Sequence, residues 1–145
     1  LNDMGIYCIH AAVDFFGPPQ EISYHPIFGP NGVDLEGKLT LTYPDFICNI
    51  ETTKIGAVRS GCFIKGKNGF LTQDGALNEF TNCCAKIDNQ ELVINEQSGE
   101  NRMIYEMAKF RDAILNKDQE FFEKSALQSI YASMILQKSH KNVLH

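Results

Sequence analysis

The sequence lacks the signals that would assign it to a membrane or to nucleic acid. No apolar run approaches the ~18 residues that a transmembrane helix needs, and the first residues do not resemble a secretory signal peptide. The net charge is −5, which argues against a phosphate backbone as a partner. We therefore expect neither a membrane nor nucleic acid among the partners.

Cysteine is present, but in no pattern that builds a disulfide framework or a zinc site. The cysteines are odd in number and form no C-x-x-C pair. They are Cys8, Cys48, Cys62, Cys83 and Cys84. We therefore expect reduced thiols, a cytoplasmic protein and no metal site. We interpret the adjacent Cys83 and Cys84 as two small, half-buried apolar residues.

A phosphate-binding loop is also missing. The segment Gly66-Lys67-Asn68-Gly69 lacks the glycine spacing followed by Lys and Ser or Thr, and it joins two expected strands instead of opening a helix. An Asn-Gly pair is typical of a tight β-hairpin turn. We therefore predict a hairpin here and no nucleotide site.

The composition that remains is that of an ordinary globular domain. The chain has 145 residues, of which 43% are hydrophobic and 21% charged. This length supports one domain with a real core and is short for two. We therefore expect a single domain over residues 1–145.

The first sixteen residues predict an amphipathic helix with two distinct stripes. The apolar stripe consists of Ile6, Ile9, Val13 and Phe16. The polar stripe consists of Asp3, Tyr7, His10 and Asp14. Gly17 is expected to cap the helix, and Pro18 and Pro19 prevent its continuation. The apolar stripe would dock on a sheet, and the polar stripe either presents chemistry or is plain solvated surface.

The middle of the chain predicts about six strands. They cover residues 21–28, 38–43, 46–53, 58–65, 70–73 and 91–95. Pro26 cannot donate to a strand ladder, which favours an edge position. Leu39, Leu41 and Tyr43 alternate with polar residues and should share one face. The connections are too short for parallel crossovers, so we expect a mainly antiparallel meander, with residues 74–90 irregular.

The last third of the sequence predicts two helices, over about residues 101–115 and 123–138. The first has an apolar stripe that we interpret as core. This stripe consists of Met103, Met107, Phe110 and Ile114. The second helix should turn five residues inward, and we expect a frayed tail with His140 and His145 after it. These five are Leu127, Ile130, Tyr131, Met134 and Ile135.

These elements predict an α+β fold. We expect a largely antiparallel or mixed sheet of about six strands, with the helices packed on one face. The other face would stay open for dimerisation, and its candidate residues have intermediate polarity. They are Thr40, Thr42, Thr53 and Arg59.

Four short segments, in order, span nearly the whole chain. They are Asp3-Met-Gly-Ile-Tyr-Cys-Ile-His10, Gly32-Val-Asp34, Phe63-Ile-Lys-Gly-Lys-Asn-Gly69 and Tyr105-Glu-Met-Ala-Lys-Phe-Arg-Asp-Ala-Ile114. They resemble the "D-x-G-x-Y/H", "GVD", "I-x-G-x-x-G" and "Y-x-x-E-x-x-x-F-x-x-A-I" motifs in the second domain of the glucose-fructose oxidoreductase, inositol dehydrogenase and rhizopine-catabolism (Gfo/Idh/MocA) family. The family's glycine-rich nucleotide fingerprint and its "E-K-P" lysine are absent. Because the chain starts at Leu1, within the first motif, we expect a C-terminal fragment without its nucleotide-binding domain.

The resemblance implies roles for three residues. Tyr7 occupies the position of the residue that transfers the proton, and a phenol with a pKa of about 10 needs a nearby cation to act as a base at neutral pH. The resemblance supplies that cation as a lysine from the missing domain. Asp3 would hold the local hydrogen-bond geometry, although it could equally cap the helix. His10 would lie beside the substrate hydroxyls, unless it is merely an exposed helical histidine.

Two functions follow as expectations. The first is the C-terminal substrate-binding and dimerisation domain of an oxidoreductase that acts on a sugar, cyclic polyol or dihydrodiol by hydride transfer. NAD or NADP would be bound mainly by the missing N-terminal Rossmann domain, whose ribose-contacting loop chooses between them. The partners would be that domain, a small-molecule substrate and a second copy of the chain, in a homodimer or higher homo-oligomer. The alternative is a non-catalytic α+β dimerisation or ligand-binding module.

Overall fold

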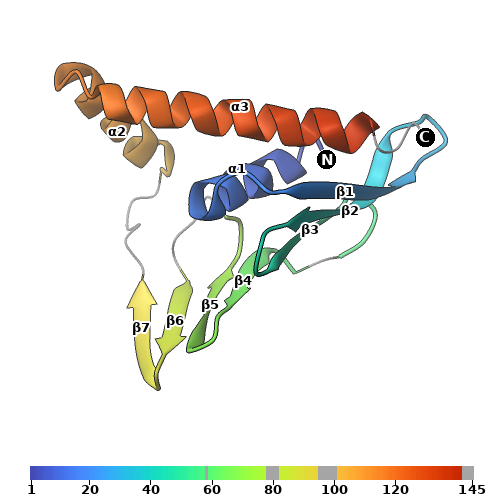
Figure 1. Cartoon of the computed structure of the whole chain (residues 1–145), viewed down its shortest axis with the longest axis horizontal. Helices are drawn as coiled ribbons and strands as arrows, with labels where there is room; N and C mark the ends of the chain where they lie inside the picture. The colour runs from blue at the N-terminus through green and yellow to red at the C-terminus, as the bar shows by residue number, and fades with distance from the viewer. Residues whose placement is uncertain (58, 78–81, 95–100, 142–145) are drawn as a thin grey trace. The chain divides into compact units, whose positions relative to one another are not determined.

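The structure is a computed structural model that describes residues 1–57, 59–77, 82–94 and 101–141. Within these ranges the chain forms three helices and seven strands (Figure 1). They divide between two compact units. The first unit comprises Leu1–Val58 and Glu120–His145, and the second comprises Arg59–Gln119. Over the described residues, no helix combines the length and apolarity of a membrane span.

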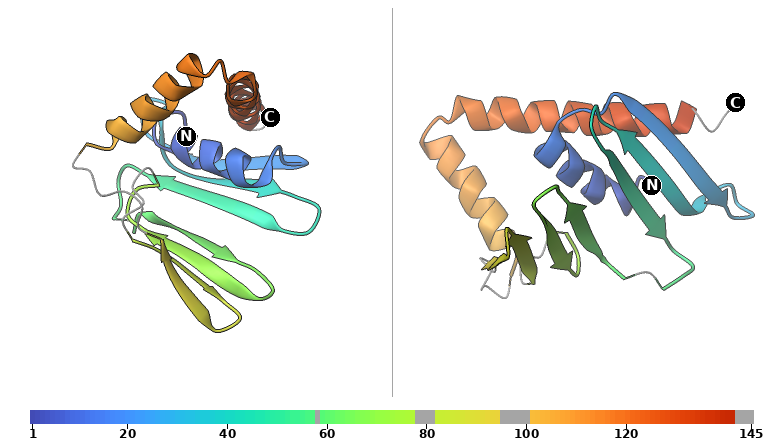
Figure 2. Two further views of the ribbon diagram at one scale, coloured as in Figure 1. Left: turned by 90° about the vertical axis from the view of Figure 1, so that its left-hand side faces the viewer. Right: turned by 60° about the horizontal axis from the view of Figure 1, so that its bottom comes forward.

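The first unit is a three-stranded antiparallel sheet covered on one face by two helices (Figures 1 and 2). Its strands are β1 (Glu21–Phe28), β2 (Asp34–Thr42) and β3 (Ile47–Thr53), in the order β1-β2-β3. Its helices are α1 (Gly5–Phe16) and α3 (Gln119–Lys141). Every residue of α3 except Gln119 belongs to this unit.

The core of the first unit lies between the sheet and these two helices. α1 contributes Ile9 and Val13, and β2 contributes Leu39 and Leu41, all of them buried. Each such side chain contributes roughly 1.5–3 kcal/mol when it is fully buried. The predicted alternation in β2 and the predicted apolar stripe of α1 are therefore confirmed. So is the cap, since Gly17 has φ 74° and its N–H donates to the Val13 carbonyl at 2.8 Å.

Pro26 lies in an edge strand, as its missing N–H predicts. Among the strands that the structure describes, β1 is hydrogen-bonded to β2 alone, and Pro26 lies opposite Gly37. The Tyr24 ring covers Gly37, where an added Cβ would lie 2.3 Å from the Tyr24 hydroxyl. Gly37 is therefore required by close packing, and the aromatic ring fills the space that its missing side chain leaves.

The second unit contains a four-stranded antiparallel sheet in the order β4-β5-β6-β7 and the helix α2 (Met103–Leu115). Its strands are β4 (Gly61–Lys65), β5 (Gly69–Asp74), β6 (Cys83–Ile87) and β7 (Gln90–Ile94). The predicted hairpin between β4 and β5 is confirmed. The expected irregular segment 74–90 was wrong in part, because Cys83–Ile87 is a strand. Asp88 and Asn89 have φ 49° and 65°, which makes the tight turn into β7.

The predicted inward stripes of the last two helices are only partly correct. In α2 the stripe is between 48% and 59% exposed, so it is not core. In α3, Ile135 is buried and Tyr131 half-buried, whereas Leu127, Ile130 and Met134 are exposed. The buried arc of α3 is instead centred on Ala132, Ile135 and Ser139. Periodicity identifies an apolar face, but it does not say which neighbour covers that face.

The α+β class and the antiparallel pairing are confirmed, with the described strands divided between two sheets. The three predicted threonines do share one face of the first sheet, because Thr40 and Thr42 alternate with the buried leucines and Thr53 pairs with Glu36. The prediction that Arg59 lies on the same face was wrong. Arg59 belongs to the second unit, where it forms an ion pair with Asp74 at 2.6 Å. Val58 and Asn95, the ends of two predicted strands, lie outside the described residues.

Candidate functional site

The polar stripe of α1 lies on the side of the helix that does not face the core. Ile9 and Val13 fix that orientation, because both are buried against the sheet and α3. The Tyr7 side chain is consequently 64% exposed, and His10 is half-buried. Among the residues that the structure describes, none forms a hydrogen bond with the Tyr7 hydroxyl or the His10 ring. Both groups are therefore available for contact with another molecule.

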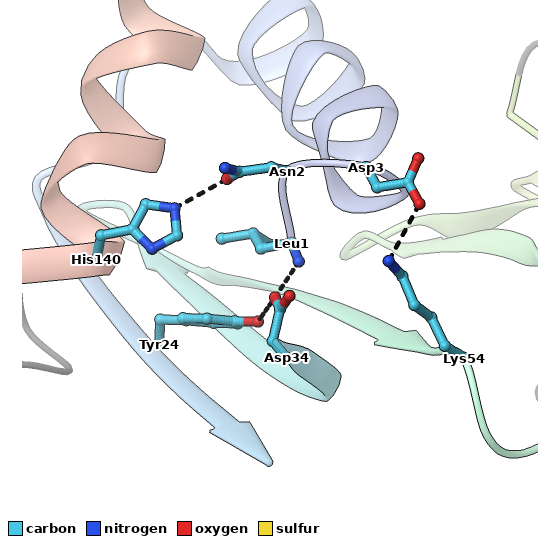
Figure 3. A network of polar contacts seen from close by, with 7 residues as sticks. All are labelled: Leu1, Asn2, Asp3, Tyr24, Asp34, Lys54 and His140. Carbon is cyan, nitrogen blue, oxygen red and sulfur yellow. Dashed lines mark hydrogen bonds and ion pairs between the residues drawn. The ribbon is translucent and has the colours of Figure 1, made fainter. Parts of the chain in front are cut away.

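Asp3 does not cap α1. The N-cap residue is Met4, and the helix start has no side-chain cap hydrogen bond within the described residues. Asp3 lies in the turn before the helix, where its carboxylate pairs with the Lys54 ammonium at 3.1 Å (Figure 3). The capping interpretation is thus wrong. The structure places Asp3 at the start of the polar stripe, four residues before Tyr7.

Lys54 is a cation at this end of the stripe, and no motif or periodicity in the sequence indicates it. It follows β3 directly, and its N–H donates to the Leu35 carbonyl at 2.7 Å. The turn after it is fixed by Thr53, whose hydroxyl accepts from the N–H groups of Ile55 and Gly56 at 3.2 and 3.0 Å. The only sequence signal was a lysine at a strand end, and sequence distance hid its proximity to Asp3.

Asp14, at the other end of the stripe, is tied to α3. Its carboxylate pairs with the Lys124 ammonium at 3.0 Å and accepts a hydrogen bond from the Gln128 amide. A cavity of about 340 Å³ adjoins these residues, with Val13, Gly17 and Leu127 in its lining. The contacts of Asp14 with Lys124 and Gln128 therefore join α1 to α3 beyond the shared apolar core.

Asp34, from the "GVD" motif, fixes the start of the chain. It accepts hydrogen bonds from the Leu1 nitrogen and from the Tyr24 hydroxyl, the latter at 2.6 Å (Figure 3). In the chain that begins at Leu1, burial raises the pKa of the Asp34 carboxyl, but the hydrogen bond and charge of the Leu1 ammonium, together with the Tyr24 hydrogen bond, outweigh it and the pKa lies below its ordinary value. Burial, followed by the hydrogen bond to Asp34, raises the pKa of Tyr24. Asp34 therefore holds the segment that carries Asp3 against the sheet.

A second contact holds the same segment to α3. The His140 ring and the Asn2 side-chain amide oxygen form a hydrogen bond of 2.9 Å (Figure 3). His140 belongs to the last turn of α3, so the expectation of a frayed tail was wrong at this residue, while His145 lies outside the described residues. The residues before α1 are thus fixed from both sides, by β2 and by α3.

The described residues contain no group of three or more metal-ligating side chains, and no disulfide joins the cysteines among them. Cys83 is buried and Cys84 half-buried in β6, in agreement with their interpretation as small apolar residues. Burial, with a smaller contribution from Cys83, raises the pKa of the Cys62 thiol. A raised pKa disfavours the reactive thiolate, so this thiol has the character of a structural residue.

Two curated proteins are similar to this chain. It is 26% identical over 143 residues to scyllo-inositol 2-dehydrogenase (NADP(+)) IolU of Bacillus subtilis (strain 168), a match that covers 99% of this chain and 44% of that protein. It is 26% identical over 110 residues to the uncharacterized oxidoreductase YgjR of Escherichia coli (strain K12), covering 76% of this chain and 34% of that protein. The chain thus spans less than half the length of these relatives. No family model matches it.

Solved structures share the fold. A "putative oxidoreductase" from Klebsiella pneumoniae has a TM-score of 0.64 at 14% identity and covers 97% of this chain and 46% of that one. A second, from Bacteroides fragilis, has a TM-score of 0.61 at 15% identity and covers 97% of this chain and 49% of that one. At this identity the likeness concerns the fold alone. Together with the two curated relatives, it confirms the resemblance drawn from the four sequence motifs.

Proposed function

We propose that this chain is the C-terminal substrate-binding and dimerisation domain of a nicotinamide-dependent enzyme, a proposal that its resemblance to Gfo/Idh/MocA oxidoreductases supports. The substrate class is a sugar, cyclic polyol or dihydrodiol, as the scyllo-inositol dehydrogenase relative suggests. The observation that carries the proposal is the exposed Tyr7 hydroxyl, which the described part of the fold does not use. It lies on a helix whose opposite face is fixed in the core.

The described residues do not fit a dinucleotide by themselves. Every strand pair in them is antiparallel, whereas a dinucleotide site needs parallel strands joined by a helix that starts at a glycine-rich turn. NAD or NADP would therefore be held mainly by an N-terminal domain. When bound, the nicotinamide supplies the hydride chemistry.

The residues of this chain would then transfer the proton and hydrogen-bond the substrate hydroxyls. In alcohol oxidation, Tyr7 takes the proton from the reacting hydroxyl, and in the reverse direction it returns that proton. His10, three residues later on the same stripe, would hydrogen-bond a neighbouring hydroxyl. Asp3, four residues before Tyr7, would hold the local hydrogen-bond geometry.

The open face of the sheet β1-β2-β3 is the surface proposed for a homodimer. It lies opposite the helices and carries Thr40, Thr42 and the exposed Ile47. Thr40 donates a hydrogen bond to Asn49 across the sheet at 3.0 Å, and Lys38 pairs with Glu51 on the same face at 3.4 Å. Polar groups that already have partners can be buried against a second copy at lower desolvation cost than unpaired ones.

The proposal is tested with the intact protein, purified with its own N-terminal part. NAD⁺ and NADP⁺ are each incubated with a panel of inositols, aldoses and cyclic dihydrodiols, and formation of the reduced nucleotide is followed at 340 nm. We expect reduction with at least one polyol or sugar. Binding of these substrates without any nucleotide reduction would instead support a non-catalytic ligand-binding module.

A further inference from the structure

We propose that Lys54 is a positioning residue for proton transfer at Tyr7 and that it acts through Asp3. This inference rests on the proposed function of Tyr7 and adds a residue to it. Lys54 comes from the end of β3 and Asp3 from the turn before α1, so the ion pair joins two segments that are far apart in sequence (Figure 3). The pair lies where the polar stripe begins, four residues before Tyr7.

The ion pair contributes little to folding. The side chains of Lys54 and Asp3 are 35% and 75% exposed, and exposed pairs typically contribute about 0–1 kcal/mol. Yet the fold holds both partners in place. Hydrogen bonds of the Lys54 backbone and of Thr53 fix the turn on one side, and the contacts of Leu1 and Asn2 fix the segment on the other. A well-fixed pair with little value for stability points to a local electrostatic role.

That role follows from the sign of the two charges. An unpaired Asp3 carboxylate beside Tyr7 would oppose formation of the phenolate that accepts the proton, whereas the Lys54 ammonium cancels this charge. Further charged or titratable groups lie on the stripe itself or contact the segment before α1 and the last turns of α1. They are His10 and Asp14 on α1, Asp34 on β2, and Lys124 and His140 on α3. Each of them except His10 has a partner of its own within the described residues. Lys54 is therefore the cation that pairs with Asp3.

The same helix provides a matched control. Lys124 pairs with Asp14 at 3.0 Å, nearly the distance of the Lys54 pair, and Asp14 lies seven residues after Tyr7 instead of four before it. Both lysines can be replaced by Met, which keeps most of the apolar stem and removes the charge. If only nearby charge matters, the Lys54 and Lys124 variants should differ.

The experiment measures the pH profile of kcat/KM for alcohol oxidation by the intact protein. In water, a unit charge about 6 Å from a titrating group changes its protonation equilibrium by roughly threefold, or about half a pH unit. We therefore expect Lys54→Met to move the acidic limb upward by about half a unit and to lower kcat/KM at neutral pH about threefold. Lys54→Arg should restore the wild-type profile, and Lys124→Met should leave it unchanged.

A double variant tests whether Lys54 acts through Asp3. In an Asp3→Asn background, Lys54→Met should have no further effect on the profile, because no carboxylate remains to be neutralised. An unchanged profile in the single variant, or a shift that persists in the Asp3→Asn background, would overturn the inference. The variant Tyr7→Phe distinguishes a failure of the proposed role of Lys54 from a failure of the proposed function of Tyr7. If Tyr7→Phe is inactive while Lys54→Met behaves as wild type, only the role of Lys54 fails, whereas an active Tyr7→Phe variant removes the proposed function of Tyr7 itself.

Discussion

Ile9 should be the residue of α1 whose truncation destabilises the first unit most. It is 0% exposed and packs in the core between the sheet and α3. Ile9→Ala removes three carbons, each worth about 0.8 kcal/mol on burial. Together with the cost of the remaining cavity, this gives a loss of about 3 kcal/mol in the free energy of unfolding. Because α1 carries Tyr7 on its other face, the same substitution tests what holds the proposed site in position.

The control for this prediction is Ile104→Ala in α2. Ile104 is 59% exposed, and the substitution makes the same chemical change with the same gain in helix propensity. We expect an effect within about 0.5 kcal/mol. With an m-value of about 2 kcal/mol/M, Ile9→Ala should lower the urea midpoint by roughly 1.5 M. Hydrogen exchange by mass spectrometry, read on peptides of α1 and β2, assigns the loss to the first unit. An Ile9→Ala loss below about 1 kcal/mol, or an equal loss in both variants, would refute this account of the core.

Three further predictions concern the rest of the molecule. Burial raises the pKa of Asp34, but in the chain that begins at Leu1 the terminal ammonium and the Tyr24 hydroxyl hold it below the ordinary 3.8. The stability that Asp34 contributes to this chain is therefore present above that pH and is lost as the pH falls through the folded pKa. Tyr24→Phe should cost about 1.5–3 kcal/mol at neutral pH and weaken this acid dependence, as measured by urea unfolding from pH 7 to pH 2. The chain alone should bind neither NADH nor NADPH in calorimetry. Micromolar binding of either would contradict the proposal that an N-terminal domain holds the nucleotide. In light scattering at tens of micromolar, the chain should have about twice its monomer mass of 16.3 kDa, and Ile47→Asp should reduce it to one copy; a wild-type monomer would argue against the open-face dimer.

Local periodicity was enough to predict the elements of the first unit. The stripe of Ile9 and Val13 and the alternation of Leu39 and Leu41 depend only on which neighbours share a face, and the structure buries all four. The glycine cap of α1 and the edge position of Pro26 follow from backbone chemistry at single residues. Such features are local, and the sequence specifies them directly.

Features that depend on distant contacts were not predictable in the same way. The stripe of Met103 and Met107 has the period of a buried helix face, but its exposure depends on what covers it. β6 was missed because Cys83–Ile87 is short and contains a single β-branched residue, which is a weak strand signal.

The ion pair of Asp3 and Lys54 illustrates the same limit within the candidate site. The α1 stripe could be predicted, because its residues recur at helical spacing. Its partner from β3 could not, because only the folded chain brings the two segments together. The choice between cap and site residue for Asp3 likewise needed the helix start, which lies at Gly5 with Met4 as the N-cap.

Tyr7→Phe in the intact protein tests the central claim most directly. The substitution removes the hydroxyl and keeps the ring, and since Tyr7 is exposed, the fold should change little. Positioned acid–base groups typically contribute about 10²–10⁴-fold, so kcat for the natural polyol or sugar should fall within roughly that range while the affinity for the nucleotide stays unchanged. If the variant instead kept most of its kcat, Tyr7 would be a surface phenol and the proton would have to pass through another group, with His10 the next candidate on the same stripe.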